Sequence, residues 1–177
     1  DKVFDADAGV YGSWFPGATC NTCYNALDRH VANGRADQTA VIHDSAITGT
    51  KQSLTYGELL REVVALSAVL ANHGVTRGDR VIIYMPMITE AVVSMLACAR
   101  QGAIHSVVFG GFAARELATR INDARAKLII SASCGLEPNR IVAYKPLLDE
   151  AIELCEHRPQ HCVVFQREQL ACDLIEG

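Results

Sequence analysis

Hydrophobic and polar positions follow two periodicities from residue 55 onwards. Apolar residues first recur at helical spacing, and short apolar runs rich in β-branched residues then alternate with further helical stretches. The pattern predicts helices at 55–74, 89–102, 113–124 and 145–157, and strands at 80–85, 104–109, 126–133 and 162–166. Strands that alternate with helices of about ten to fifteen residues indicate right-handed crossovers. We therefore predict an α/β fold, with a mainly parallel sheet and flanking helices.

Local signals mark where several of these helices begin and end. Thr55 and Glu58 form a capping-box pattern at the start of the first helix. Gly74 and Gly102 each follow the last periodic residue of a helix. Glycine adopts the left-handed conformation that closes a helix, so we expect both residues to be C-terminal caps.

The first 38 residues follow neither periodicity. Large aromatic side chains stand among glycine and proline, and a short helix is predicted around 24–34. This composition predicts an N-terminal arm over residues 1–38 that packs aromatic anchors onto another surface. Two β-type runs at 40–43 and 52–55 then predict a hairpin with a long loop, so the α/β part occupies residues 39–177.

Composition excludes several classes of function. The 177 residues include 16 Lys and Arg against 20 Asp and Glu, a net charge of −4 with no basic tract, so we expect no nucleic-acid partner. No apolar run is long enough to span a bilayer, and the start of the chain lacks the layout of a signal peptide. We expect a cytoplasmic protein without a membrane partner. The chain begins with Asp1 rather than methionine, which suggests a piece of a longer protein.

Seven cysteines and six histidines do not form a recognisable metal or redox site. The cysteines are odd in number and mostly in apolar surroundings, which favours reduced core thiols over a disulfide framework. Cys20 and Cys23 have a suggestive spacing, but no second pair completes four zinc ligands. His105 begins a strand and is predicted to be a hydrogen-bonded core imidazole. We therefore expect no metal ligands and name no catalytic residue.

Two glycines, Gly110 and Gly111, follow the strand at 104–109 and precede a helix. Glycine at this point serves a tight turn, because it takes positive φ without strain, or it lets a ligand approach the carboxyl end of a strand closely. The phosphate-binding patterns GxGxxG and GxxxxGK[ST] are both absent. The residues alone leave both alternatives open.

A second candidate lies beyond the strand at 126–133. The stretch that leads to Arg140 is rich in turn residues, and we expect it to be irregular. A lone cation there can hold a phosphate, but a solvated surface arginine is an equal alternative.

Several stretches together resemble one family closely. They are residues 14–30, LTYGELL at 54–60, the long block GDRVIIYMPMITEAVVSMLACARQGAIHSVVFGGF at 78–112, RINDARAKLIISAS at 120–133 and YKPLLDEAI at 144–152. The chain resembles the N-terminal part of the AMP-forming short-chain acyl-CoA synthetases, the acetyl-CoA and propionyl-CoA synthetase group. Residues 133–151 are more similar to the propionyl branch. The resemblance implies the N-terminal arm typical of these enzymes and the first part of the adenylate-forming domain.

The resemblance also implies a reaction and its site residues. Family members make an acyl-adenylate from a carboxylate and Mg-ATP, and then transfer the acyl group to coenzyme A (CoA). Gly110 and Gly111 are implied to lie beside the pantetheine tunnel. The segment implied to contact the CoA nucleotide is Glu137, Pro138, Asn139 and Arg140. Glu137 stands where acetyl-type enzymes carry an arginine, which leaves Arg140 as the cation.

The rest of the family machinery is implied to lie beyond residue 177, including the ATP loop, the acidic group that positions magnesium and the catalytic lysine. The chain alone is then expected to be inactive, with the remainder of the ligase as its partner. A mitochondrial matrix location is the alternative to the cytoplasm. A non-catalytic CoA- or nucleotide-binding module, or a structural half-domain, are the alternative functions.

Overall fold

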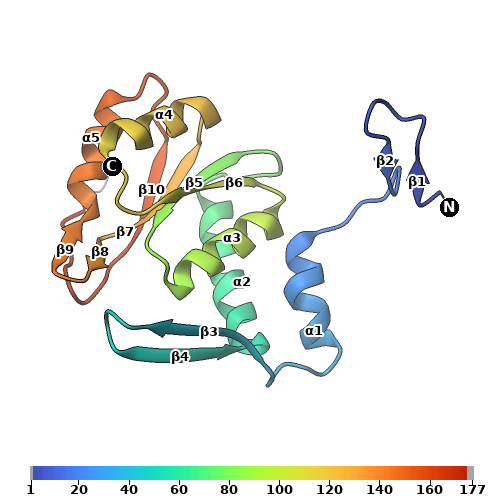
Figure 1. Ribbon diagram of the computed structural model, residues 1–177, viewed down its shortest axis with the longest axis horizontal. Helices are drawn as coiled ribbons and strands as arrows, with labels where there is room; N and C mark the ends of the chain where they lie inside the picture. Colours follow the sequence, from blue (N-terminus) through green and yellow to red (C-terminus); the bar gives the residue numbers. More distant parts are fainter. Residues whose placement is uncertain (1, 175–177) are drawn as a thin grey trace.

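The computed structural model describes residues 2–174, and its centre is a four-stranded parallel sheet (Figure 1). The strands are β5 (Arg80–Met85), β6 (Ile104–Phe109), β7 (Leu128–Ala132) and β10 (His161–Phe165). Their order is β10-β7-β5-β6, and every neighbouring pair is parallel. The predicted parallel α/β sheet is confirmed.

Helices cover both faces of this sheet. They are α2 (Tyr56–Asn72), α3 (Thr89–Gln101), α4 (Ala114–Ala124) and α5 (Tyr144–Leu154). α2 and α3 pack against a core that includes Val81 and Ile83, whereas α4 and α5 pack against one that includes Ile82 and Tyr84. Successive side chains of a strand point to opposite faces, so the continuous apolar run of β5 supplies both cores.

The predicted helix boundaries hold to within a few residues. The Glu58 amide donates to the Thr55 hydroxyl at 3.2 Å, and the Thr55 amide donates to the Glu58 carboxylate at 2.8 Å, which completes the capping box. Gly74 and Gly102 have φ of 73° and 70°, as expected of C-terminal caps. α5 ends at Leu154 rather than at 157, and β7 is shorter than predicted.

Two antiparallel hairpins flank the sheet. The predicted first one is confirmed as β3 (Thr39–Ser45) and β4 (Thr50–Thr55). The second, formed by β8 (Cys134–Glu137) and β9 (Arg140–Ala143), lies where an irregular stretch was predicted, and that prediction is wrong. Pro138 and Asn139 occupy only the tip of the hairpin, and the four residues on either side pair in regular register.

The N-terminal region has two different parts. β1 (Phe4–Asp5) and β2 (Ser13–Trp14) form a small hairpin that stands apart from the sheet and its helices (Figure 1). The short helix predicted around 24–34 is present as a π-helical turn, Tyr24–Asp28, continued by α1 (Arg29–Ala32). Its Leu27 is fully buried in the core of α2 and α3. The boundary of the arm at residue 38 stays a prediction.

None of the helices within residues 2–174 is long and apolar enough to cross a membrane.

Candidate functional site

The strand order creates one place where the connections reverse direction. The chain passes from β5 to β6 on one side, and from β6 it returns across β5 to β7 on the other side. Open α/β sheets bind ligands at such a reversal, in the crevice outside the carboxyl ends of the strands. Met85 at the end of β5 and Ala132 at the end of β7 mark this place.

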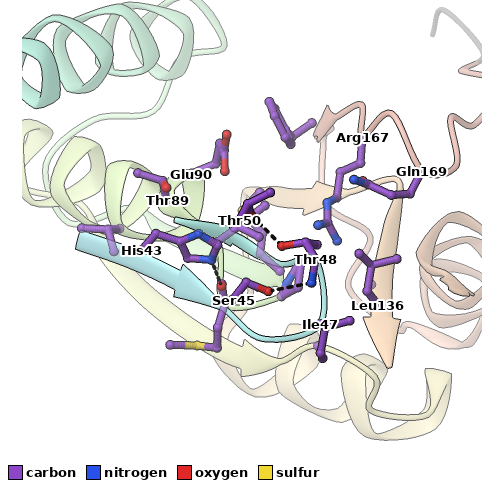
Figure 2. A pocket seen from close by; sticks show the side chains of 18 of the residues that line it. His43, Ser45, Ile47, Thr48, Thr50, Thr89, Glu90, Leu136, Arg167 and Gln169 are labelled. Atoms are coloured by element: carbon purple, nitrogen blue, oxygen red, sulfur yellow. Dashed lines mark hydrogen bonds between the residues drawn. The ribbon is translucent and has the colours of Figure 1, made fainter. Parts of the chain in front are cut away.

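A groove of about 1210 Å³ lies at this end of the sheet. The β3–β4 hairpin forms one side, and it is tied to the end of β5 because His43 Nε2 lies 3.1 Å from the carbonyl oxygen of Met87. Figure 2 shows His43 and Thr48 of the hairpin together with Arg167 and Gln169 around the groove. The groove therefore joins the end of the parallel sheet to a hairpin far away in sequence.

The lining of the groove is largely apolar. Met87, Phe109 and Ile42 are 80%, 67% and 64% exposed, which is high for such large apolar side chains. Among the described lining residues Arg167 is the single arginine or lysine, and four carboxylates accompany it: Asp44, Glu90, Glu137 and Glu168. This balance favours a neutral or cationic occupant over a strongly anionic one.

Gly110 and Gly111, which follow β6, are each required to be glycine for a different structural reason. A β-carbon on Gly110 would overlap the Tyr144 hydroxyl and would lie 2.8 Å from the carbonyl oxygen of Met85. Gly111 has φ of 104°, which residues with a side chain rarely adopt, but a β-carbon there would meet nothing within 4 Å. Gly110 is thus required by packing and Gly111 by the backbone turn. Contact of either residue with pantetheine stays a prediction.

Tyr144, the first residue of α5, lies at the centre of a corner that it forms with Gly110 and Gly135. Its side chain is 3% exposed and packs on Tyr84 with ring centroids 4.9 Å apart. A β-carbon on Gly135 of β8 would lie 2.6 Å from Tyr144 Cζ, so a second glycine makes room for the same ring. Burial raises the pKa of Tyr144 to about 12, which keeps the hydroxyl protonated at neutral pH.

Tyr84 fixes the glycine turn itself. Its hydroxyl donates to the carbonyl oxygen of Phe112 at 3.0 Å and so ties the turn to β5. Arg167, which lines the groove, is held by β8, because its guanidinium donates to the carbonyl oxygen of Cys134 at 3.1 Å. Sequence reasoning missed Tyr144 and Gly135, although a glycine inside a short strand is a signal for close approach of another group.

The predicted nucleotide segment lies at the tip of the β8–β9 hairpin. Glu137 and Arg140 are paired in the strand register, and Arg140 Nε donates to the Glu137 carboxylate at 2.7 Å. This hydrogen bond lowers the pKa of Glu137 below its usual range. The cation expected to be available for a phosphate is therefore engaged by an acid, and both side chains are exposed.

The AMP-binding enzyme family matches residues 27–174. The chain belongs to this family. It is 53% identical over 155 residues to the mitochondrial acyl-CoA synthetase short-chain family member 3 of Bos taurus, covering 88% of this chain and 23% of the relative. It is 47% identical over 176 residues to the propionate–CoA ligase of Salmonella typhimurium, covering 99% and 28%. The resemblance inferred from sequence is confirmed, and the chain spans about a quarter of the length of the curated relatives it matches.

Within this member of the AMP-binding family, the predicted site residues divide into two groups. Gly110 and Glu137 line the groove, whereas the others do not: Gly111, Pro138, Asn139 and Arg140. The side chain of His105 is exposed on β6, so the predicted core imidazole is wrong. Within residues 2–174, β6 is an edge strand with a single neighbour, which local sequence does not reveal.

The cysteines take no part in this site. All seven are free, with Cys20 exposed and Cys23 buried. Within residues 2–174, no three His, Cys, Asp or Glu side chains are grouped so that they could hold a metal ion.

Proposed function

We propose that this chain is the first part of the AMP-binding domain of a short-chain acyl-CoA synthetase that uses propionate or acetate. The observation that carries the proposal is the 47% identity over 176 residues to a relative named propionate–CoA ligase. The carboxylate oxygen of the acid attacks the α-phosphorus of ATP and pyrophosphate leaves. The CoA sulfur then attacks the acyl carbon, AMP leaves, and the thiol proton passes to solvent.

The chain contributes a part of the CoA entrance. The groove lies at the reversal of the sheet, where the fold binds ligands, and Gly110 stands in its lining. The pantetheine arm of CoA is thin and uncharged, which suits a groove with a single arginine among four carboxylates. The nucleotide end, which carries the phosphates, reaches the segment Glu137, Pro138, Asn139 and Arg140 at the tip of the second hairpin.

The chemical steps depend on the remainder of the ligase, which is the expected partner of this chain. Transfer at phosphorus needs several positioned cations, and the groove offers Arg167 alone among its described lining residues. ATP, magnesium and the catalytic lysine therefore act outside this chain, and the chain alone is inactive. The cytoplasm stays the predicted compartment, with the mitochondrial matrix as the alternative suggested by the name of the Bos taurus relative.

The test is the activity of the full reading frame that contains this sequence, compared with the 177-residue chain. We expect the full protein to exchange pyrophosphate with ATP when propionate or acetate is present, and to release AMP when CoA is added. Absence of both activities in a folded full-length protein would contradict the ligase and favour a CoA-binding module or a structural half-domain. Pyrophosphate release by the short chain would show that the chain is not inactive. Fractionation of cells that produce the full protein tests the compartment.

A further inference from the structure

The Tyr144 hydroxyl is an unusual polar group in this structure. The residue is almost completely buried, but the hydroxyl has no hydrogen-bond partner among the described residues. Every fully buried side-chain nitrogen or oxygen of those residues does have a partner. The hydroxyl is therefore reached from the groove, whose lining includes Tyr144.

Two neighbouring glycines make room for the Tyr144 side chain. Gly110 of the turn after β6 and Gly135 of β8 both lack the β-carbon that would overlap Tyr144. Glycine inside a strand weakens it, so Gly135 within β8 indicates a demand for space beside the Tyr144 ring. At Gly110 the nearest group is the Tyr144 hydroxyl, followed by the carbonyl oxygen of Met85, and at Gly135 the β-carbon would also overlap ring carbons of Tyr144.

Tyr84 provides an internal comparison. The two rings are packed together, but the Tyr84 hydroxyl is bonded to the Phe112 carbonyl oxygen. Tyr84 therefore has a structural role for its hydroxyl, and Tyr144 has none within the described residues.

We propose that the Tyr144 hydroxyl is a ligand-binding group of the groove, which forms a hydrogen bond with an amide of the ligand that enters past Gly110. This inference rests on the proposed function for the identity of the ligand, the pantetheine arm of CoA. The position of the hydroxyl rests on the geometry of Gly110, Gly135 and Tyr144.

The chemistry of the groove selects an amide over a phosphate. Of the four lining carboxylates, Asp44 and Glu137 are paired with Lys51 and Arg140, and the two others, Glu90 and Glu168, still outnumber Arg167. A phosphate there would therefore meet more negative than positive charge. A neutral phenol both donates and accepts a hydrogen bond, as an amide does. Because burial holds the pKa of Tyr144 near 12, the hydroxyl keeps its proton over the whole neutral range.

The test uses the full-length ligase with Tyr144→Phe, which removes the hydroxyl and keeps the ring. We expect the KM for CoA to rise about threefold to tenfold, the effect of one neutral hydrogen bond. The KM values for ATP and for the acid, the pyrophosphate exchange without CoA, and Tm should stay unchanged. Tyr56→Phe is the matched control, because Tyr56 begins α2, stacks on His30 and lies outside the groove lining.

A second measurement distinguishes an amide from a phosphate as the bonded group. Pantetheine lacks every phosphate of CoA but keeps both amides, so Tyr144→Phe should raise the KM for CoA and the KM for pantetheine by the same factor. The assignment of Tyr144, but not the proposed function, would be overturned by either of two results in an enzyme that depends normally on CoA. One is an unchanged KM for CoA in Tyr144→Phe, and the other is a rise in KM for CoA alone. A wild-type enzyme without CoA dependence would overturn the proposed function, and with it the ligand.

Discussion

The β8–β9 hairpin takes part in two sites that are built differently. Near its open end, Gly135 packs with Gly110 and Tyr144 in a corner, whereas at its tip Glu137 and Arg140 form a turn. The corner is buried, and three segments of the chain are shaped to one another around a neutral hydroxyl. The turn is exposed, and its two charges already satisfy one another. A buried group held in one position loses little freedom when it binds, whereas an exposed ion pair must first be broken. We therefore expect the corner to matter more than the turn.

Of the substitutions that test this comparison, Gly110→Ala should have the largest effect on stability. The new methyl group overlaps the Tyr144 hydroxyl and approaches the Met85 carbonyl oxygen, which is backbone and does not move aside easily. We expect the free energy of unfolding of the ligase to fall by about 2–3 kcal/mol, as in other overpacked sites. Thermal and urea unfolding measure it.

Two further variants test the cause of this loss. Tyr144→Phe in the same chain should recover part of the loss, because it removes one of the two overlapping groups. Gly57→Ala is the control, since Gly57 lies inside α2, lacks positive φ, and its nearest neighbour, the Ala36 carbonyl oxygen, is 3.3 Å away. Equal losses for Gly110→Ala and Gly57→Ala would show that the corner is not tightly packed.

Gly111→Ala should have a smaller effect with a different origin. No atom lies within 4 Å of the new methyl group, so the cost comes only from the backbone at φ of 104°. We expect a loss of about 1–2 kcal/mol in the free energy of unfolding. The loss should be the same in wild type and in a Tyr144→Phe background, because the methyl group does not touch Tyr144. A coupling above about 0.5 kcal/mol in the double variant would contradict this separation.

The dependence of stability on pH distinguishes the buried Tyr144 hydroxyl from an exposed tyrosine hydroxyl. The pKa of Tyr144 in the folded protein is about 12 against an ordinary value of 10, so the neutral form is favoured in the fold. This contribution is complete below pH 10 and is lost as the pH rises towards 12. Wild type should therefore lose about 1 kcal/mol more stability at pH 11 than Tyr144→Phe, relative to neutral pH. Parallel pH profiles of the two proteins, from thermal melting, would exclude the shift.

These two regions also show what sequence could and could not predict. The parallel sheet and its helices were predictable because strands such as β5 are apolar throughout and helices such as α2 carry their caps within a few residues. The β8–β9 hairpin was missed, because strands of four residues are too short to show a periodicity. The exposure of His105 was missed, because it depends on which strand lies at the edge.

The candidate site was predictable only in part, for the same reason. Gly110 was identified from its position after a strand, but the reason for it lies in Tyr144, which is 34 residues away in the sequence. The Glu137–Arg140 pair required the hairpin register that sequence analysis did not predict. Local patterns find the ends of elements, and tertiary packing decides which side chains meet there.

Arg140→Ala should have a smaller effect than Gly110→Ala, Gly111→Ala or Tyr144→Phe. The guanidinium is already bonded to Glu137, and both groups are exposed, so its loss should weaken CoA binding to the full-length ligase by no more than about threefold. Glu137→Gln should free Arg140 and strengthen CoA binding slightly, with a steeper dependence on salt, because an exposed charge is screened. Isothermal titration with CoA at two salt concentrations measures both variants. A tenfold loss in Arg140→Ala would reverse the comparison, because the exposed turn would then contribute as much as the buried corner.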